Sequence, residues 1–101
     1  MVKRVIWTLK SHNDRKEILL FWKRRNQSST YSKKLNNLFK TAINLIAAHP
    51  YIGRKTNIEG VRVKLVRDYL LFYEIDKEEI FILTIWDSRR NPKDAPYKSN
   101  S

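Results

Sequence analysis

Residues 61–87 of the chain read VRVKLVRDYLLFYEIDKEEIFILTIWD, and this stretch decides the fold. Apolar and basic residues alternate from Val61 to Leu65, which is typical of a β-strand with one buried face. Tyr69–Ile75 and Ile80–Trp86 are nearly continuous runs of aliphatic and aromatic residues, a composition that favours strands. The charged residues 76–79 between these runs suit a short hairpin connection. We therefore predict a three-strand antiparallel meander.

A helical repeat precedes the meander. Apolar side chains recur there at intervals of three or four residues, the period of an α-helix, at Tyr31, Leu35, Leu38, Phe39, Ala42, Leu45 and Ile46. We expect Ser28, Ser29 or Thr30 to cap the start of this helix. Pro50 is expected to end it, because proline disfavours helical geometry at the residue before it.

The N-terminal part predicts one strand and one further helix. Residues 3–9 alternate weakly, as in a short strand. Ile18, Leu19 and Trp22 then form one apolar stripe of a helix. The candidate caps of this helix are Ser11, Asn13 and Asp14. The order of strand, helix, helix and meander predicts an α+β fold, with the helical hairpin on one face of a largely antiparallel sheet.

Length and composition indicate one globular domain over residues 1–101, 42% hydrophobic, with a polar, frayed tail from Asp94. Residues 53–60 are expected to form a loop. The absence of cysteine excludes disulfides and thiolate chemistry, and His12 and His49 are isolated, so we expect no metal and no cofactor. No apolar run approaches the roughly 20 residues of a membrane span, and residues 1–4 lack a signal-peptide pattern, so a cytoplasmic location without a membrane partner is expected.

Positive charge is the strongest compositional feature of the chain. Twenty-one Lys and Arg stand against 10 Asp and Glu, a net charge of +11, which indicates an acidic partner. Residues 23–40 contain basic residues and no acidic one, and we interpret them as solvent-facing sides of two helices, with docking on nucleic acid as the alternative. The oligomeric state is left open.

A second basic cluster lies before and within the first strand of the meander. Arg54, Lys55 and Arg62 are candidates for contacting nucleic acid or another target. Arg62 and Lys64 share one face of their strand, because side chains two residues apart point the same way. If the sheet curls, this face, the preceding loop and the tail form one basic cleft. Tyr97 stands alone in the polar tail, where no core pattern places it.

The last two strands are apolar on both faces, which two helices cannot easily cover. Either the sheet curves around its own core or one face awaits a partner. Coverage of that face by the tail and loops is an equally good interpretation.

Four motifs, in this order of elements, resemble the RelE/ParE family of bacterial toxins over roughly residues 5–93. They are HPYIG at residues 49–53, VRV at 61–63, YLLFY at 69–73 before an acidic turn, and IWDSRRNP at 85–92. The resemblance implies the toxin half of a bacterial type II toxin–antitoxin pair. It also implies a cognate antitoxin that lays a helix or strand over the apolar and basic surfaces of the toxin.

The family contains two activities, and the resemblance leaves both open. Members that cleave mRNA on the ribosome use basic residues around the meander, with a basic residue and a tyrosine near the C-terminus. By this resemblance the metal-independent catalytic candidates are Lys64, Arg67, Arg89, Arg90 and Tyr97. Such nucleases usually carry an arginine directly after the tyrosine that opens the central strand, where here Leu70 follows Tyr69.

Other family members poison DNA gyrase by binding it, without a catalytic cluster. The ending from Trp86 to Pro92 resembles these members at least as much. The expected target is thus ribosome-bound mRNA or DNA gyrase. Outside the family, the alternative function is a small basic nucleic-acid-binding module without toxicity.

Overall fold

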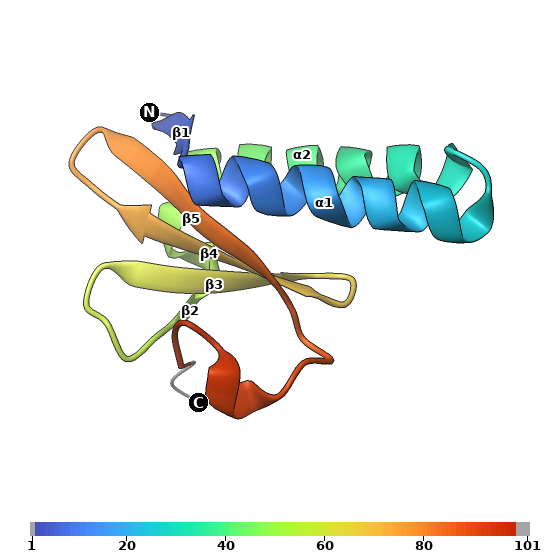
Figure 1. Ribbon diagram of the computed structural model, residues 1–101. Helices are drawn as coiled ribbons and strands as arrows, with labels where there is room; N and C mark the ends of the chain where they lie inside the picture. Colours follow the sequence, from blue (N-terminus) through green and yellow to red (C-terminus); the bar gives the residue numbers. More distant parts are fainter. Residues whose placement is uncertain (1, 99–101) are drawn as a thin grey trace.

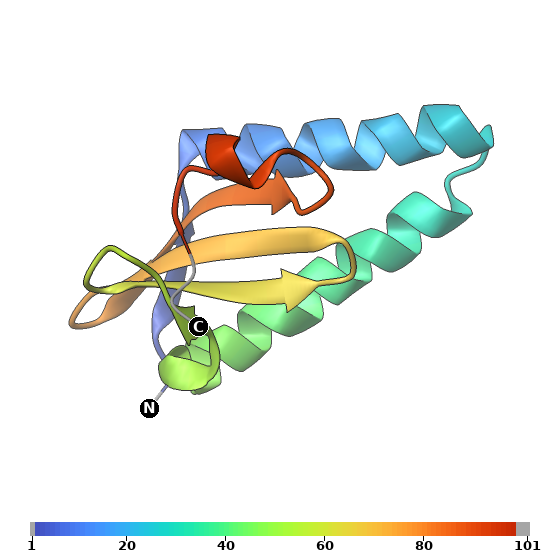
Figure 2. The ribbon, with the colours of Figure 1, turned by 90° about the horizontal axis from the view of Figure 1, so that it is seen from below.

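The computed structural model describes residues 2–98 and confirms the α+β fold. The elements follow along the chain as β1 (Arg4–Trp7), α1 (Leu9–Asn26), α2 (Thr30–Ala48), η1 (Pro50–Ile52), β2 (Arg54–Lys55), β3 (Val61–Val66), β4 (Tyr69–Ile75), β5 (Glu79–Asp87) and η2 (Pro92–Asp94). The two helices form a hairpin on one face of the sheet, and the C-terminal segment lies on the opposite side (Figure 1). Seen from below, the hairpin projects beyond the end of the sheet (Figure 2).

The sheet has five strands in the order β1-β5-β4-β3-β2. The antiparallel meander of β3, β4 and β5 is confirmed, with Val63 opposite Phe72 at its centre. β1 is an edge strand that pairs in parallel with β5, where Trp7 lies opposite Ile82. Parallel neighbouring strands require a long crossover connection. Here the connection from β1 to β5 includes the helical hairpin and strands β2, β3 and β4.

The expected loop at residues 53–60 contains a short strand that the sequence did not predict. In β2, Arg54 pairs with Val63 and Lys55 pairs with Arg62. Two consecutive basic residues carry no alternating hydrophobic pattern, so the pairing depends on where η1 places the chain rather than on local sequence. The loop that remains connects β2 to β3.

The first helix begins earlier than the sequence predicted. Thr8, and not Ser11, Asn13 or Asp14, is its N-cap, and the Thr8 side chain accepts a hydrogen bond from Ser11 N at 3.2 Å. The Thr8 hydroxyl also donates to the backbone oxygen of Ile82 on β5 at 2.7 Å. Thr8 caps the helix because β1 ends directly before it, and the same contacts attach the helix start to the sheet.

Asp14 fastens α1 to the part of β5 that extends past β1. Its Oδ2 accepts from the Thr84 hydroxyl at 2.6 Å and from the Ile85 backbone N–H at 3.2 Å. Lys10 forms an ion pair with the same carboxylate at 3.1 Å. A sheet edge without a neighbouring strand has unpaired backbone groups, and Asp14 satisfies one of them.

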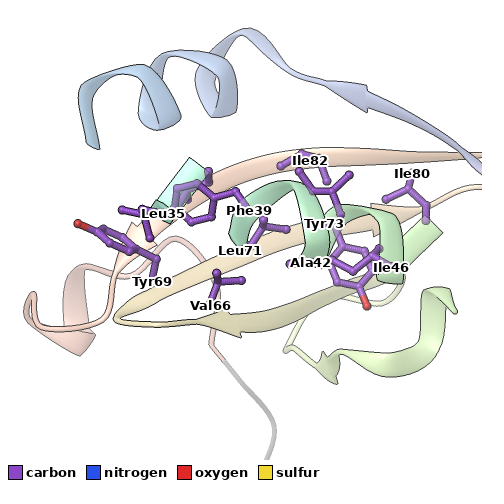
Figure 3. Packing of buried hydrophobic residues seen from close by; sticks show 12 residues of the cluster. Leu35, Phe39, Ala42, Ile46, Val66, Tyr69, Leu71, Tyr73, Ile80 and Ile82 are labelled. Carbon is purple, nitrogen blue, oxygen red and sulfur yellow. The ribbon is translucent and has the colours of Figure 1, made fainter. Parts of the chain in front are cut away.

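The second helix matches its predicted extent and provides most of the core. It begins after Ser29, one of the expected caps, and ends before Pro50. Leu35, Phe39 and Ile46 on its inner face are completely buried. They pack on the helix-facing side of the sheet, as Figure 3 shows, against Val66, Tyr69, Leu71, Tyr73, Ile80 and Ile82.

Up to residue 98 the tail is packed on the rest of the chain, whereas we expected it to be frayed. The Tyr97 ring lies 5.2 Å from the Phe72 ring, centroid to centroid. Asn57 N donates to Lys98 O at 2.8 Å, and Lys98 N donates to Asn57 Oδ1 at 3.0 Å. Residues 99–101 of the expected tail lie outside the described residues. The described tail therefore covers part of the sheet face opposite the helices.

Candidate functional site

A groove of about 410 Å³ lies on the sheet face that the tail crosses, and we call it the tail groove. Its lining comprises Ile52, Gly53, Arg54, Val63, Lys64, Leu65, Leu70, Phe72 and Tyr97. Strand alternation explains the apolar floor, because Val63 pairs with Phe72 and Leu65 pairs with Leu70, so these four side chains share one face. Three of the eight residues that the sequence singled out line this groove: Arg54, Lys64 and Tyr97.

Tyr97 reaches the groove because the tail folds back over β4. Its ring packs on Phe72 at an interplanar angle of 41°, and the bonds between Lys98 and Asn57 hold the end of the tail. Phe72 is 1% exposed. The apolar second face that the sequence indicated is thus partly covered by the chain itself. Leu65 stays 60% exposed and Ile52 45% exposed at the rim.

Arg54 is positioned by a buried hydroxyl. Tyr73 Oη accepts from Gly53 N at 3.0 Å and donates to Pro50 O at 2.6 Å, which fixes the chain just before β2. Burial raises the pKa of Tyr73 above its ordinary value. Gly53 is required at this point, since a Cβ there would lie 2.5 Å from Tyr73 Oη and 2.8 Å from Val63 O.

Arg62 fastens the same segment from the other side. Its Nη1 donates to Gly53 O at 2.8 Å and to Tyr51 O at 3.2 Å, and its guanidinium lies 5.0 Å from the centroid of the Tyr51 ring. Arg62 pairs with the core residue Tyr73, so it lies on the helix-facing side of β3. Lys55, its partner in β2, borders a separate hollow of about 350 Å³.

The single basic cleft that we expected does not form. Arg62 and the tail lie on opposite faces of the sheet, because the tail packs on Phe72. Lys64 is opposite the core residue Leu71, on the same side of β3 as Arg62, and it also borders the tail groove. The alternation rule correctly placed Arg62 and Lys64 on one face. It did not indicate on which face the tail would pack.

Arg67 is not among the residues that line the tail groove. It occupies the two-residue turn between β3 and β4 with a left-handed φ of 56°, and its side chain is exposed. This turn is at the opposite end of β3 from Arg62. Arg67 thus lies outside the lining that Lys64 and Tyr97 share.

Arg89 faces the helical hairpin and is engaged there. Its Nε and Nη2 donate to the two carboxylate oxygens of Asp87 at 2.9 and 2.8 Å, and its guanidinium lies 5.7 Å from the Trp22 ring. Arg89 lowers the pKa of Asp87 through these hydrogen bonds, and Asp87 in turn raises the pKa of Arg89. Trp22 Nε1 donates to Tyr69 Oη at 2.7 Å, and burial is the main cause that raises the pKa of Tyr69.

Arg90 lies on the opposite side of the sheet from Arg89. Its guanidinium lies 4.1 Å from the centroid of the Trp86 ring, a cation–π contact. Trp86 pairs with Leu70, which belongs to the face of the tail groove. The adjacent arginines Arg89 and Arg90 thus contact aromatic rings on opposite sides of the sheet.

The tail groove combines two cations and one phenol with an apolar floor. This set can bind an anionic group beside an aromatic or apolar one. None of its described lining residues is Asp, Glu or His, so proton transfer in the groove would fall to Lys64 and Tyr97. Over residues 2–98, no group of three potential His, Cys, Asp or Glu ligands is close enough to hold a metal ion.

The sequence reasoning missed the residues that build the groove floor and position β2. Phe72 and Tyr73 belong to a predicted strand, and both are buried, but their contacts with Tyr97 and Gly53 were not predicted. The available signal was β4 itself, which is apolar on both faces and therefore requires a cover on each.

Neither described helix has the length and apolar composition needed to span a bilayer.

Comparison with known proteins agrees with this architecture. Residues 5–92 match the family model for the ParE toxin of the type II toxin–antitoxin system parDE. A solved chain from the chromosomal ParDE TA system of P. aeruginosa has a similar fold, with a TM-score of 0.70 and 18% sequence identity. The match covers 85% of this chain and 96% of that one. No curated protein matches the sequence significantly. The family match extends over most of the chain, and the chain therefore belongs to the ParE toxin family of type II toxin–antitoxin systems.

Proposed function

We propose that this toxin arrests growth by binding DNA gyrase, without chemistry of its own, and that a cognate antitoxin neutralises it. One observation carries the choice of target. The five candidate catalytic residues are distributed over separate places: Lys64 and Tyr97 at the tail groove, Arg67 on a turn, and Arg89 and Arg90 on opposite sides of the sheet.

A nuclease needs these groups around one phosphate. Cleavage requires a base, cations that stabilise the charged transition state and a proton donor for the leaving oxygen, all within hydrogen-bond reach of the reacting atoms. Arg89 is already paired with Asp87, and Arg90 is stacked on Trp86. Only Lys64 and Tyr97 remain together, which supports action by binding.

The second candidate target is ribosome-bound mRNA, and the tail groove favours it. Arg54 and Lys64 offer cations there, and Tyr97 offers a phenol. On this alternative, Tyr97 stacks on a base or donates the proton, while the two cations hold the phosphate.

Two parallel reactions separate the targets. In the first, purified gyrase supercoils relaxed plasmid in the presence of increasing toxin. In the second, the toxin is added to a bacterial cell-free translation reaction, and message ends are mapped by primer extension. We expect loss of supercoiling or accumulation of linear plasmid, with intact message. New message ends that require ribosomes, together with unimpaired supercoiling, would overturn the proposal.

A matched pair of variants sharpens this comparison. Tyr97→Phe removes the groove phenol, and Tyr51→Phe removes a phenol of an exposed ring outside the groove. Under the gyrase proposal both variants inhibit supercoiling as the original chain does. Under the mRNA alternative only Tyr97→Phe loses cleavage. Salt-dependent binding of DNA or RNA by a chain whose induction leaves cells unharmed would favour the non-toxic nucleic-acid-binding module.

The antitoxin proposal rests on the exposed apolar rim of the tail groove. Leu65 and Ile52 are exposed beside the part of β3 that β2 does not cover. An exposed apolar rim next to an uncovered strand edge suits an added strand or helix of a partner. We expect Leu65→Lys to weaken capture by the product of an adjacent antitoxin gene at least tenfold, measured by calorimetry, with Leu9→Lys on the exposed start of α1 as the control. Equal affinity of both variants would place the antitoxin elsewhere.

A further inference from the structure

The free end of the helical hairpin concentrates positive charge. We define the hairpin tip as residues 23–34, which join the end of α1 to the start of α2 and project beyond the sheet in both views (Figures 1 and 2). The tip has no acidic residue and has five exposed basic ones: Lys23, Arg24, Arg25, Lys33 and Lys34.

The cations of the hairpin tip have no partner within the described residues. The ion pairs of residues 2–98 are Arg4 with Glu79, Lys10 with Asp14, and Arg89 with Asp87. The arginines of the cation–π contacts are Arg15, Arg62, Arg89 and Arg90. The positive charge of the hairpin tip is therefore fully available to an external anion.

The cations near the start of α2 work against their own helix, whereas those in the last turn of α1 suit its dipole. Lys33 and Lys34 lie near the start of α2, where the helix dipole is positive and disfavours cations. Stability alone gives no reason for lysines at these positions, whereas a bound polyanion would offset the repulsion. Asn26 at the end of α1 and Gln27 in the connecting turn add exposed side-chain amides, which commonly contact phosphates beside Lys and Arg.

The neighbouring aromatic rings favour a duplex over a single strand. Trp22 and Tyr31 pack on each other with centroids 5.0 Å apart, and Trp22 is further bonded to Tyr69. Trp22 and Tyr31 are thus occupied internally. Phe21 is exposed but is a single ring edge-on to Trp22, whereas proteins that bind single strands stack successive bases on several free rings. A projecting helix end instead fits the major groove of duplex DNA, which admits an α-helix.

We propose that the hairpin tip binds the phosphate backbone of double-stranded DNA, without sequence preference. This surface is separate from the tail groove, and its contact with DNA does not require gyrase. An acidic protein is the competing occupant, because Leu20 and Phe21 are exposed just before the tip and offer apolar contacts. The experiment therefore includes an acidic polypeptide and omits gyrase, so its result is independent of the toxin's target.

The assay is fluorescence anisotropy of the full chain with a labelled duplex of about 20 base pairs, at salt concentrations from about 50 to 200 mM. Each phosphate contact contributes about 0.9 to the slope of log affinity against log salt, so five cations give a slope of about −4 to −5. This slope is measured on the unmodified chain and tests the proposal before any substitution. No salt-dependent binding at the lowest salt would overturn it.

Two triple variants with equal charge locate the contact. K23Q/K33Q/K34Q changes the tip, and K77Q/K93Q/K98Q changes exposed lysines elsewhere, so each variant loses three charges from +11. We expect the tip variant to bind at least tenfold more weakly near 100 mM salt, with a slope smaller by about 3. The control should stay within threefold of the original, and both variants should melt at the same temperature by circular dichroism. Equal losses in both, or tip-dependent binding to polyglutamate but not to DNA, would refute the proposal.

Discussion

Replacing Tyr73 by phenylalanine tests how the sheet positions the segment that leads into β2. The substitution leaves the buried ring in place and removes only Oη, which bonds Gly53 N at 3.0 Å and Pro50 O at 2.6 Å. Gly53 N–H and Pro50 C=O then lose this partner, at a point where Gly53 and Tyr73 are buried. The perturbation is local, because no other side chain of the core changes.

The magnitude follows from these two bonds. A typical hydrogen bond contributes about 1 kcal/mol net, and an unsatisfied buried backbone group costs about 1–3 kcal/mol. We therefore expect Tyr73→Phe to lower the free energy of unfolding by about 2–3 kcal/mol. For a domain of this size, that loss corresponds to a fall of about 10–20 °C in Tm.

Urea unfolding followed by tryptophan fluorescence measures this loss. Tyr97→Phe is the matched control, because the Tyr97 hydroxyl makes no recorded hydrogen bond among residues 2–98, and we expect a change below about 0.5 kcal/mol. An equally small change in Tyr73→Phe, at unchanged m-value, would refute the reasoning. Gly53→Ala should destabilise the fold too, since its Cβ would meet Tyr73 Oη and Val63 O, and combining it with Tyr73→Phe should cost less than the sum.

Three further perturbations probe other contacts. Asp14→Ala removes the carboxylate that accepts bonds from β5, and we expect a loss of about 2 kcal/mol in urea unfolding, with Asp14→Asn losing less. Arg89 lowers the pKa of Asp87 in the folded chain. The ionised Asp87 therefore adds to the free energy of unfolding above the unfolded pKa of about 3.9, and this contribution is lost as the pH falls through the folded pKa. Asp87→Asn should therefore narrow the difference in unfolding free energy between about pH 7 and pH 3, and an unchanged difference would contradict this linkage. Tyr97→Ala should uncover Phe72 and raise binding of a hydrophobic dye at unchanged helix content, whereas unchanged dye fluorescence would show that the tail is not a cover.

Local patterns in the sequence determined the element order and the α+β class. The 3.6-residue period predicted α2 because one face of the helix is buried from Ser32 to Ala47. Alternation and apolar runs predicted β3, β4 and β5, because each strand pairs with its neighbour in the chain. The same motifs gave the family resemblance, which the match over residues 5–92 confirmed.

Contacts between distant parts of the chain escaped prediction because no local pattern encodes them. β1 pairs with β5, although the helical hairpin lies between them in the sequence. β2 forms because η1 places Arg54 and Lys55 beside β3. Thr8 replaced the expected caps because the end of β1 places it against β5.

The candidate site was likewise predicted in part from the sequence and decided in part by the tertiary structure. The sequence supplied Arg54, Lys64 and Tyr97 as candidates, and alternation correctly put Arg62 and Lys64 on one face of β3. Alternation fixes which residues share a face, but only the tertiary structure decides which face the helices cover and which one the tail crosses. That packing left Arg62 on the helix-facing side and Tyr97 on the other, so the predicted single cleft became two separate surfaces.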